Sequence, residues 1–397
     1  MQTTALTNNN TGAQTKKFAD IIQFIRKVFS SPTDYIPLHK PHFGGNEKKY
    51  LQETIDSTFV SSVGAFVDKF EQMMQQTTSA KYAIATTNGT TALHLSLLVA
   101  GVQKGDEVIT QALTFVATAN AIAHAGAVPV FVDVDMDNLG MSAVALKEWL
   151  KNNAKVNADN ECINKQTGKR IAACIPMHSF GLPLQIEDLV EICNEYSIPV
   201  IEDAAESLGS YVGDKHTGTF GLLGTFSFNG NKTITCGGGG AVITNDEALA
   251  RKAKHLSTTA KIAHKWEFAH DEIGYNYRLP NLNAALACAQ LEQLPSILAN
   301  KRALAVLYKA FFADKDVDFI EERSNSTANY WLNTILFKTQ QEQLAFLDYT
   351  NSNGVMTRPA WKLMTDLIMY ASCQRGDLHN SKYLVERLVN IPSSYRP

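Results

Sequence analysis

Residues 226–240, FSFNGNKTITCGGGG, contain the side chain best suited to chemistry in this chain. Lys232 stands between a short aromatic strand and four glycines, and a lysine amine can act as a nucleophile. Three interpretations arise: a surface lysine beside a loose turn, a phosphate loop, or a nucleophile. The phosphate loop fails, because the glycines follow the lysine and neither G-x-G-x-x-G nor G-x-x-x-x-G-K-[ST] occurs. The glycine turn would let backbone come close to whatever the lysine carries.

A second segment, ATTNGTTALHLSLL, has the form of an anion site. We expect a strand to end at Thr87, Asn88 and Gly89 to turn the chain, and Thr90 to open a helix. The N-terminus of a helix offers backbone N–H groups and a positive dipole end to a phosphate. Simple capping of the helix by threonine is the alternative.

Acidic and aromatic residues follow further strands. In IPVIEDAAESLG, Asp203 and Glu206 come after a buried strand, where an acid can cap the next helix or hold a proton on a heterocyclic nitrogen. Phe115, in QALTFVAT, can stack on a ring or belong to the core. Asn276 and Arg278 precede a proline that starts a helix, an arrangement that also suits a subunit interface.

These pieces fit one cofactor chemistry. A phosphate cradle, an aspartate for a ring nitrogen and a lysine for a Schiff base are the requirements of pyridoxal phosphate. Thr90 and Ser227 would hold the phosphate, and Asp203 would keep the pyridine nitrogen protonated. Lys232 would form the Schiff base and, once freed by an amino substrate, would move a proton between the substrate carbon and the cofactor.

The elements that must position these residues indicate an α/β fold. From about residue 80, short apolar runs alternate with helical patterns, which predicts a largely parallel sheet covered on both faces. Such sheets bind ligands at the carboxyl ends of their strands. The expected strands cover residues 82–87, 106–111, 128–135, 172–178, 199–205, 224–229 and 241–246.

Beyond about residue 280 the pattern changes to a long helix, shorter strands and a final helix, typical of a smaller α+β domain. We therefore expect an N-terminal tail and helix (1–40), a large cofactor-binding domain (41–285) and a small C-terminal domain (286–397). Within the first region, residues 1–15 indicate a loosely attached tail, and an amphipathic helix is expected around FADIIQFIRKVF.

Composition argues against several classes of protein. The 397 residues are 45% hydrophobic and 19% charged with a net charge of -3, values that give no footprint for nucleic acid or an anionic membrane. Six cysteines form no C-x-x-C pair and no metal-ligand spacing, so we expect reduced thiols and no metal site. Neither a signal peptide nor a membrane-length apolar run is visible, and the expected location is the cytoplasm.

With these residues in place, the sequence resembles the DegT/DnrJ family of nucleotide-sugar aminotransferases. The resemblance is carried by ATTNGTTAL, IPVIEDAAESLGS, GTFSFNGNKTITCGGGGAVIT and IGYNYRLPNLNAA, in the family's order, from about residue 40 to the end. It implies a fold-type I pyridoxal-phosphate enzyme with a mostly parallel seven-stranded sheet. It also implies a homodimer with active sites at the subunit interface, L-glutamate as amine donor, and a keto group on a nucleoside-diphosphate sugar as acceptor.

The resemblance also implies roles for individual positions. Lys232 matches the Schiff-base lysine, Asp203 the partner of the pyridine nitrogen, and Ser227 a phosphate ligand. Gly89 and Thr90 match the phosphate-binding turn.

Three more positions complete the implied site. Phe115 matches the ring-stacking aromatic residue, Glu206 falls near the cofactor's 3-oxygen, and Asn276 matches a residue that reaches the phosphate from the partner subunit. Two departures from the family pattern are visible. Family members commonly have G-E-G-G after the lysine, whereas residues 237–240 are all glycine, and glutamine is common where Glu206 stands.

Within the family, the segments VITQALTFVATANAI, DNLGMS, FNGNK and TRPAWKLM look most similar to the branch that aminates C4 of UDP-linked 4-keto-2-acetamido-2,6-dideoxy sugars, on the way to legionaminic-type nonulosonic acids and other bacterial surface glycans. Residues 255–272 are the expected nucleotide-sugar loop, or alternatively a mobile surface loop. A 3-keto nucleotide sugar is an alternative acceptor.

The same residues argue against three other functions. A sugar dehydratase of this family would carry histidine in place of Lys232. A non-catalytic sugar-binding or regulatory member would have no need to keep the lysine together with Asp203, Ser227 and the phosphate turn. An NAD-dependent sugar enzyme would need a glycine fingerprint after the first strand, and none occurs.

Overall fold

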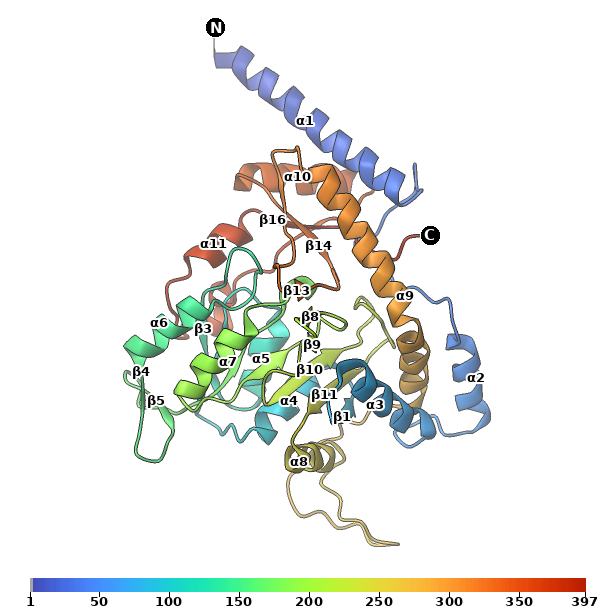
Figure 1. Cartoon of the computed structure of the whole chain (residues 1–397), viewed down its shortest axis with the longest axis vertical. Helices are drawn as coiled ribbons and strands as arrows, with labels where there is room; N and C mark the ends of the chain where they lie inside the picture. The colour runs from blue at the N-terminus through green and yellow to red at the C-terminus, as the bar shows by residue number, and fades with distance from the viewer. Residues whose placement is uncertain (1–2) are drawn as a thin grey trace.

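A seven-stranded sheet forms the central layer of the computed structural model, which describes residues 3–397 (Figure 1). Its order is β3-β2-β6-β7-β10-β11-β1, with parallel bridges from Cys174 to Val200 and from Met177 to Asp203 joining β6 to β7. Strand β11 runs antiparallel to both neighbours, and the remaining pairs are parallel. The strands are β1 (Tyr82–Thr86), β2 (Glu107–Gln111), β3 (Val128–Val132), β6 (Ile171–Ile175), β7 (Ile201–Asp203), β10 (Leu223–Ser227) and β11 (Gly240–Thr244). The expected mostly parallel seven-stranded sheet is confirmed.

Helices cover both faces of this sheet, which is why its strands are apolar on both sides. Val108 packs in the cluster that includes α4, α5 and α8, and the next residue, Ile109, packs in the cluster that includes α6 and α7 on the opposite face. The helices concerned are α4 (Gly89–Val99), α5 (Val116–His124), α6 (Ala143–Asn153), α7 (Ile186–Glu195) and α8 (Glu247–Ser257). Near β1 the second face is covered by α3 (Ala65–Thr78) and the long α9 (Asn281–Phe312), against which α2 (Glu47–Asp56) also packs.

The C-terminal region forms a second, antiparallel sheet ordered β12-β14-β16-β15. The apolar cluster on this sheet unites residues of α1, α9 and α10. The elements are α1 (Thr3–Val28), α10 (Gln340–Ser352), β12 (Asp318–Phe319), β14 (Asn333–Leu336), β15 (Arg358–Pro359) and β16 (Leu388–Ile391). Helix α1 includes the amphipathic helix expected around residues 18–29 and extends back to Thr3, through most of the segment for which the sequence predicts a tail; residues 1–2 lie outside the described residues.

Short elements connect these layers. They are β4 (Ala154–Val156), β5 (Cys162–Asn164), β8 (Tyr211–Val212), β9 (Lys215–His216), β13 (Ser326–Thr327), η1 (Ser179–Gly181), η2 (Met364–Asp366), η3 (Ile368–Tyr370) and α11 (His379–Val385). Helix α9 runs without a break across residues 285 and 286, where we expect a domain boundary, and the proposed division into domains stays a prediction.

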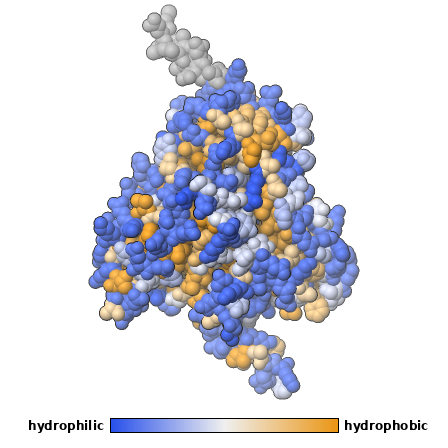
Figure 2. Space-filling view, in the orientation of Figure 1, coloured by the Kyte–Doolittle hydropathy of each residue, from blue (hydrophilic) through white to orange (hydrophobic). Residues whose placement is uncertain are grey.

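A long loop between α8 and α9 projects from the body of the molecule at the bottom of Figure 1. Its side chains include Trp266, 74% exposed, and Phe268, 82% exposed, and Figure 2 shows apolar surface on this projection. No helix in residues 3–397 is long and apolar enough to cross a membrane.

Candidate active site

A cavity of about 280 Å³ lies where the parallel strands end, the position expected for a ligand in this class of sheet. Seven residues that the sequence singles out line it: Gly89, Thr90, Phe115, Asp203, Glu206, Ser227 and Lys232. The other lining residues are Asn88, Leu93, Ala117, Met177, Ala205, Asn229, Asn231, Trp331 and Trp361. The fold therefore brings together residues that are up to 273 positions apart in the chain, from Asn88 to Trp361.

The N-terminus of α4 forms one wall of the cavity. Asn88 caps the helix by accepting a hydrogen bond from the Thr91 N–H at 2.9 Å, and the Thr91 hydroxyl in turn lies 3.2 Å from the Asn88 N–H. A methyl group at Gly89 would come within 2.8 Å of the Ser227 Cβ, so only glycine lets the first turn of α4 lie against the end of β10. The helix dipole, the first N–H groups and Ser227 thus surround one corner, a suitable place for a phosphate.

Asp203 ends β7 inside the cavity and is almost fully buried. The Thr118 hydroxyl donates to its Oδ2 at 2.7 Å, and the Ala205 N–H donates to Oδ1 at 3.2 Å. Burial raises the pKa of Asp203, against the lowering effect of these hydrogen bonds and of the Lys232 charge. Because a buried carboxylate is stabilised by a cation beside it, Asp203 is suited to hold a proton on a ring nitrogen.

Lys232 lies in the loop after β10, where its N–H donates to the Asn229 carbonyl at 3.0 Å. Its side chain is only 11% exposed, and its Nζ forms an ion pair with Glu206 Oε1 at 3.1 Å. The Trp331 ring centroid lies 4.2 Å from the same nitrogen. Lys232 is therefore enclosed in the cavity, unlike a surface lysine beside a loose turn.

Phe115 is 45% exposed although it is a large apolar side chain, and its exposed surface faces the cavity. This exposure does not fit a core phenylalanine, and it leaves the ring available for stacking on a planar ligand. Trp361 lies 6.1 Å from the Phe115 ring centroid and stacks on Phe180 at 4.6 Å.

Several of the site's contacts could not be found by sequence reasoning. Thr118 supports Asp203 from the next helix along the cavity wall, and Trp331 and Trp361 reach the cavity from the C-terminal region. No local motif signals these roles, because each depends on a contact made across the fold. Trp361 lies in the segment TRPAWKLM, but nothing in that segment marks it as a cavity residue.

The structure corrects one expectation, for the four glycines, and leaves another, for Asn276, as a prediction. The four glycines after Lys232 do not line the cavity; instead, the backbone at Gly240 lies against Asn88 as β11 pairs with β1. Asn276 also lies outside the cavity of its own chain: it is exposed, its Oδ1 accepts a hydrogen bond from Arg278 Nε at 3.0 Å, and it bridges to Thr258 at the base of the projecting loop. Its expected role toward a partner subunit stays a prediction.

The cavity fits pyridoxal phosphate. The phosphate corner, the buried Asp203 carboxylate, the Lys232 amine and the exposed Phe115 ring all border one space, and each matches a different part of that cofactor. The corner at the N-terminus of α4 suits the negative charge of a phosphate, and the buried Asp203 carboxylate suits a positive charge on the ring nitrogen. The cavity therefore matches the cofactor in charge as well as in position.

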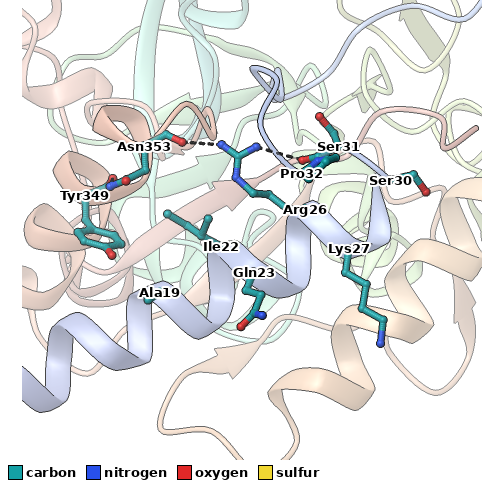
Figure 3. Close-up of a pocket in the computed structure, with 10 residues that line it drawn as sticks. All are labelled: Ala19, Ile22, Gln23, Arg26, Lys27, Ser30, Ser31, Pro32, Tyr349 and Asn353. Atoms are coloured by element: carbon teal, nitrogen blue, oxygen red, sulfur yellow. Dashed lines mark hydrogen bonds between the residues drawn. The ribbon is translucent and has the colours of Figure 1, made fainter.

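A larger hollow of about 530 Å³ lies between α1 and α10 and lacks such chemistry (Figure 3). The guanidinium of Arg26 is its central polar group, and it donates to the carbonyls of Ser31, Asp34 and Asn353. Those bonds fasten the end of α1 to the end of α10. The hollow is therefore a seam between two helices, and we assign the candidate active site to the cavity around Lys232.

Comparisons with known proteins agree on the class of protein. The model of the DegT/DnrJ/EryC1/StrS aminotransferase family matches residues 41–396. The chain is 37% identical over 360 residues to the GDP-perosamine synthase of Escherichia coli O157:H7, covering 90% of this chain and 93% of that protein. It is 34% identical to the GDP-perosamine synthase of Vibrio cholerae, covering 90% and 94%. Among solved structures, the aminotransferase TlmJ from Streptoalloteichus hindustanus superposes with a TM-score of 0.81 at 25% identity, covering 90% and 93%.

Proposed function

Because the chain belongs to the DegT/DnrJ/EryC1/StrS aminotransferase family, we propose that it transfers the amino group of L-glutamate to the C4 keto group of a nucleoside-diphosphate-linked deoxy sugar. Aminotransferase activity and the use of pyridoxal phosphate follow from the family. The single observation that supports the reaction most directly is the buried Lys232 amine, which shares its cavity with Asp203 and the phosphate corner.

Each of the cavity residues would have a separate role in the reaction. Pyridoxal phosphate, when bound, supplies a sink for the electrons released when a substrate C–H bond breaks. Asp203, oriented by Thr118, would hold the ring nitrogen protonated, and Ser227 with the N-terminus of α4 would fix the phosphate. The Lys232 amine would take the proton from the substrate carbon and return it on the other side of the transfer.

C4 as the aminated position is supported by the relatives. Three of them are GDP-perosamine synthases, and perosamine is a 4-amino sugar. The nucleotide is a finer question: these relatives favour GDP, whereas the sequence segments described above favour a UDP-linked 2-acetamido sugar of the legionaminic type. A 4-keto group is common to both acceptors.

The projecting loop supports a homodimer with shared active sites. Asn276 lies outside its own cavity, at the base of a loop that exposes Trp266, Phe268 and Ile273. Exposed apolar side chains of this kind are typical of contact surfaces. In a dimer the loop would reach the second copy, and Asn276 would complete that copy's phosphate corner.

A glutamate-dependent assay on purified protein tests the reaction. The panel contains GDP- and UDP-linked 4-keto sugars and matched 3-keto sugars, and the amino sugar is identified by mass spectrometry and NMR. Amination confined to 4-keto acceptors supports the proposal, and amination confined to 3-keto acceptors overturns it. Mixing Asn276→Ala subunits with Lys232→Ala subunits tests the shared site, because only mixed dimers could then hold one complete site.

A further inference from the structure

The amine of Lys232 lies between two groups that both favour its positively charged form. Glu206 Oε1 is 3.1 Å from Nζ on one side, and the Trp331 ring centroid is 4.2 Å away on another. Both partners are buried, so little water screens either attraction. Glutamine, which is common at this position in the family, could offer the amine a hydrogen bond but no charge.

Glu206 is held so that one oxygen is directed to the lysine. Its Oε2 accepts a hydrogen bond from the Phe180 N–H at 2.8 Å. Phe180 has φ of 57°, a left-handed conformation that is costly for a bulky residue, and it is fully buried. The strained turn therefore fixes the carboxylate and leaves Oε1 to the Lys232 amine.

Hydrogen bonds also hold Trp331 in place. Its indole N–H donates to the Asn231 carbonyl at 2.6 Å, one residue before the lysine. Its backbone N–H donates to Asn329 Oδ1 at 2.7 Å, and its carbonyl accepts from Lys301 Nζ at 3.1 Å. The first of these bonds ties the ring to the loop that carries Lys232, and the other two hold the backbone of Trp331, so the ring and the amine keep their relative positions.

We propose that Glu206 and Trp331 form a binding site for the ammonium of Lys232, which the ammonium occupies whenever the lysine carries no covalent partner. The inference rests on the proposed function for its catalytic meaning: the ammonium is the form in which Lys232 carries the proton that it has taken from substrate carbon. To become a nucleophile again, the ammonium gives one proton to solvent, and the N–H electron pair stays on nitrogen.

The carboxylate must be ionised to act in this way. Burial raises the pKa of Glu206 to about 7, against the lowering effects of the Lys232 charge and the Phe180 N–H. The charged groups facing it are Lys232, from the loop after β10, and Asp203, from β7. The attraction of Glu206 for the ammonium is thus about half lost at pH 7, is strongest well above that pH, and disappears as Glu206 takes a proton below it.

Chemical labelling of the full-length protein, after removal of cofactor, tests the inference without turnover. Trace acetic anhydride modifies only neutral amines, and peptide mass spectrometry gives the rate at Lys232 relative to exposed lysines. Glu206→Gln keeps an oxygen for the Phe180 N–H and removes the charge. We expect it to raise the Lys232 labelling rate at least fivefold at pH 8.5, with a ratio to wild type near one at pH 6. Trp331→Leu should raise the rate about twofold, and Trp331→Phe should restore part of the difference.

Glu107→Gln is the matched control, because Glu107 is a buried carboxylate that binds Asn164 and lies outside the cavity. It should leave Lys232 labelling unchanged. An unchanged rate in Glu206→Gln at every pH overturns the inference, since a carboxylate that merely anchors the Phe180 turn would give that result. Because labelling needs no substrate, loss of the ammonium site and failure of the sugar assay are separate outcomes.

Discussion

The buried side chain of Lys301 tests how strongly burial disfavours a charged group in this fold. Its side chain is completely buried on α9, and its Nζ donates to the carbonyls of Trp331 at 3.1 Å and Ser393 at 2.6 Å. Desolvation lowers its pKa from 10.5 to about 7. At about 1.36 kcal/mol per pKa unit, a shift of roughly 3.5 units means that the charged form costs about 5 kcal/mol in the native state.

The sign of the resulting pH dependence follows from proton linkage. Between pH 7 and 10.5 the native amine is mostly neutral while the unfolded chain keeps its proton, so the unfolded state binds more protons and stability rises with pH. From pH 7 to 9.5 this rise amounts to about 3 kcal/mol. Lys301→Met removes the titrating group, so the free energy of unfolding of wild type minus that of the variant should increase by this amount over the same interval.

Urea unfolding of both proteins at half-unit steps from pH 6 to 9.5 measures this difference, and groups that titrate in both proteins cancel. Lys48→Met, at an exposed lysine, is the control and should run parallel to wild type. A difference between wild type and Lys301→Met that stays flat within about 0.5 kcal/mol would refute the reasoning, because that is well below the rise expected from linkage.

Three further predictions concern the cavity. Lys232→Ala should abolish amino transfer, measured as glutamate-dependent product, while leaving the circular dichroism spectrum unchanged. Gly89→Ala should weaken cofactor binding tenfold or more in a fluorescence titration, because the added methyl group meets Ser227 at 2.8 Å and pushes the phosphate corner apart. Thr118→Val removes a hydrogen bond that lowers the pKa of Asp203, so the acidic limb of the activity profile should move to higher pH.

The sequence predicted the large sheet well for a specific physical reason. Strands buried on both faces are apolar at most positions, so VPVFV at β3 and IAACI at β6 stand out as continuous runs. The site residues found in advance lie where such runs stop. Asp203 and Ser227 end strands, and Gly89 opens a helix, so each could be located from the run beside it.

Contacts between residues far apart in the sequence could not be predicted from apolar runs and the residues that follow them. The Trp331 ring reaches Lys232 only because α9 and the antiparallel sheet bring residue 331 back over the end of β10, and nothing near position 331 marks the approach. The sequence also gives no sign of the strained turn at Phe180, since phenylalanine is an unfavourable choice for a left-handed conformation. Its role follows only from the Glu206 carboxylate that its N–H holds.

The four glycines after Lys232 separate into positions with different requirements, which makes the departure from G-E-G-G testable. A methyl group at Gly240 would overlap the carbonyl oxygen of Asn88, whereas one at Gly238 would meet nothing closer than the Thr87 carbonyl oxygen at 3.7 Å. Glycine is therefore required at 240 by the close approach of β11 to the phosphate corner, and it is not required at 238. Gly238→Glu should fold and melt like wild type, while Gly240→Ala should lose about 1–3 kcal/mol of stability and weaken cofactor binding. A melting temperature for Gly238→Glu as low as that of Gly240→Ala would show that the unbroken run is a requirement of the backbone.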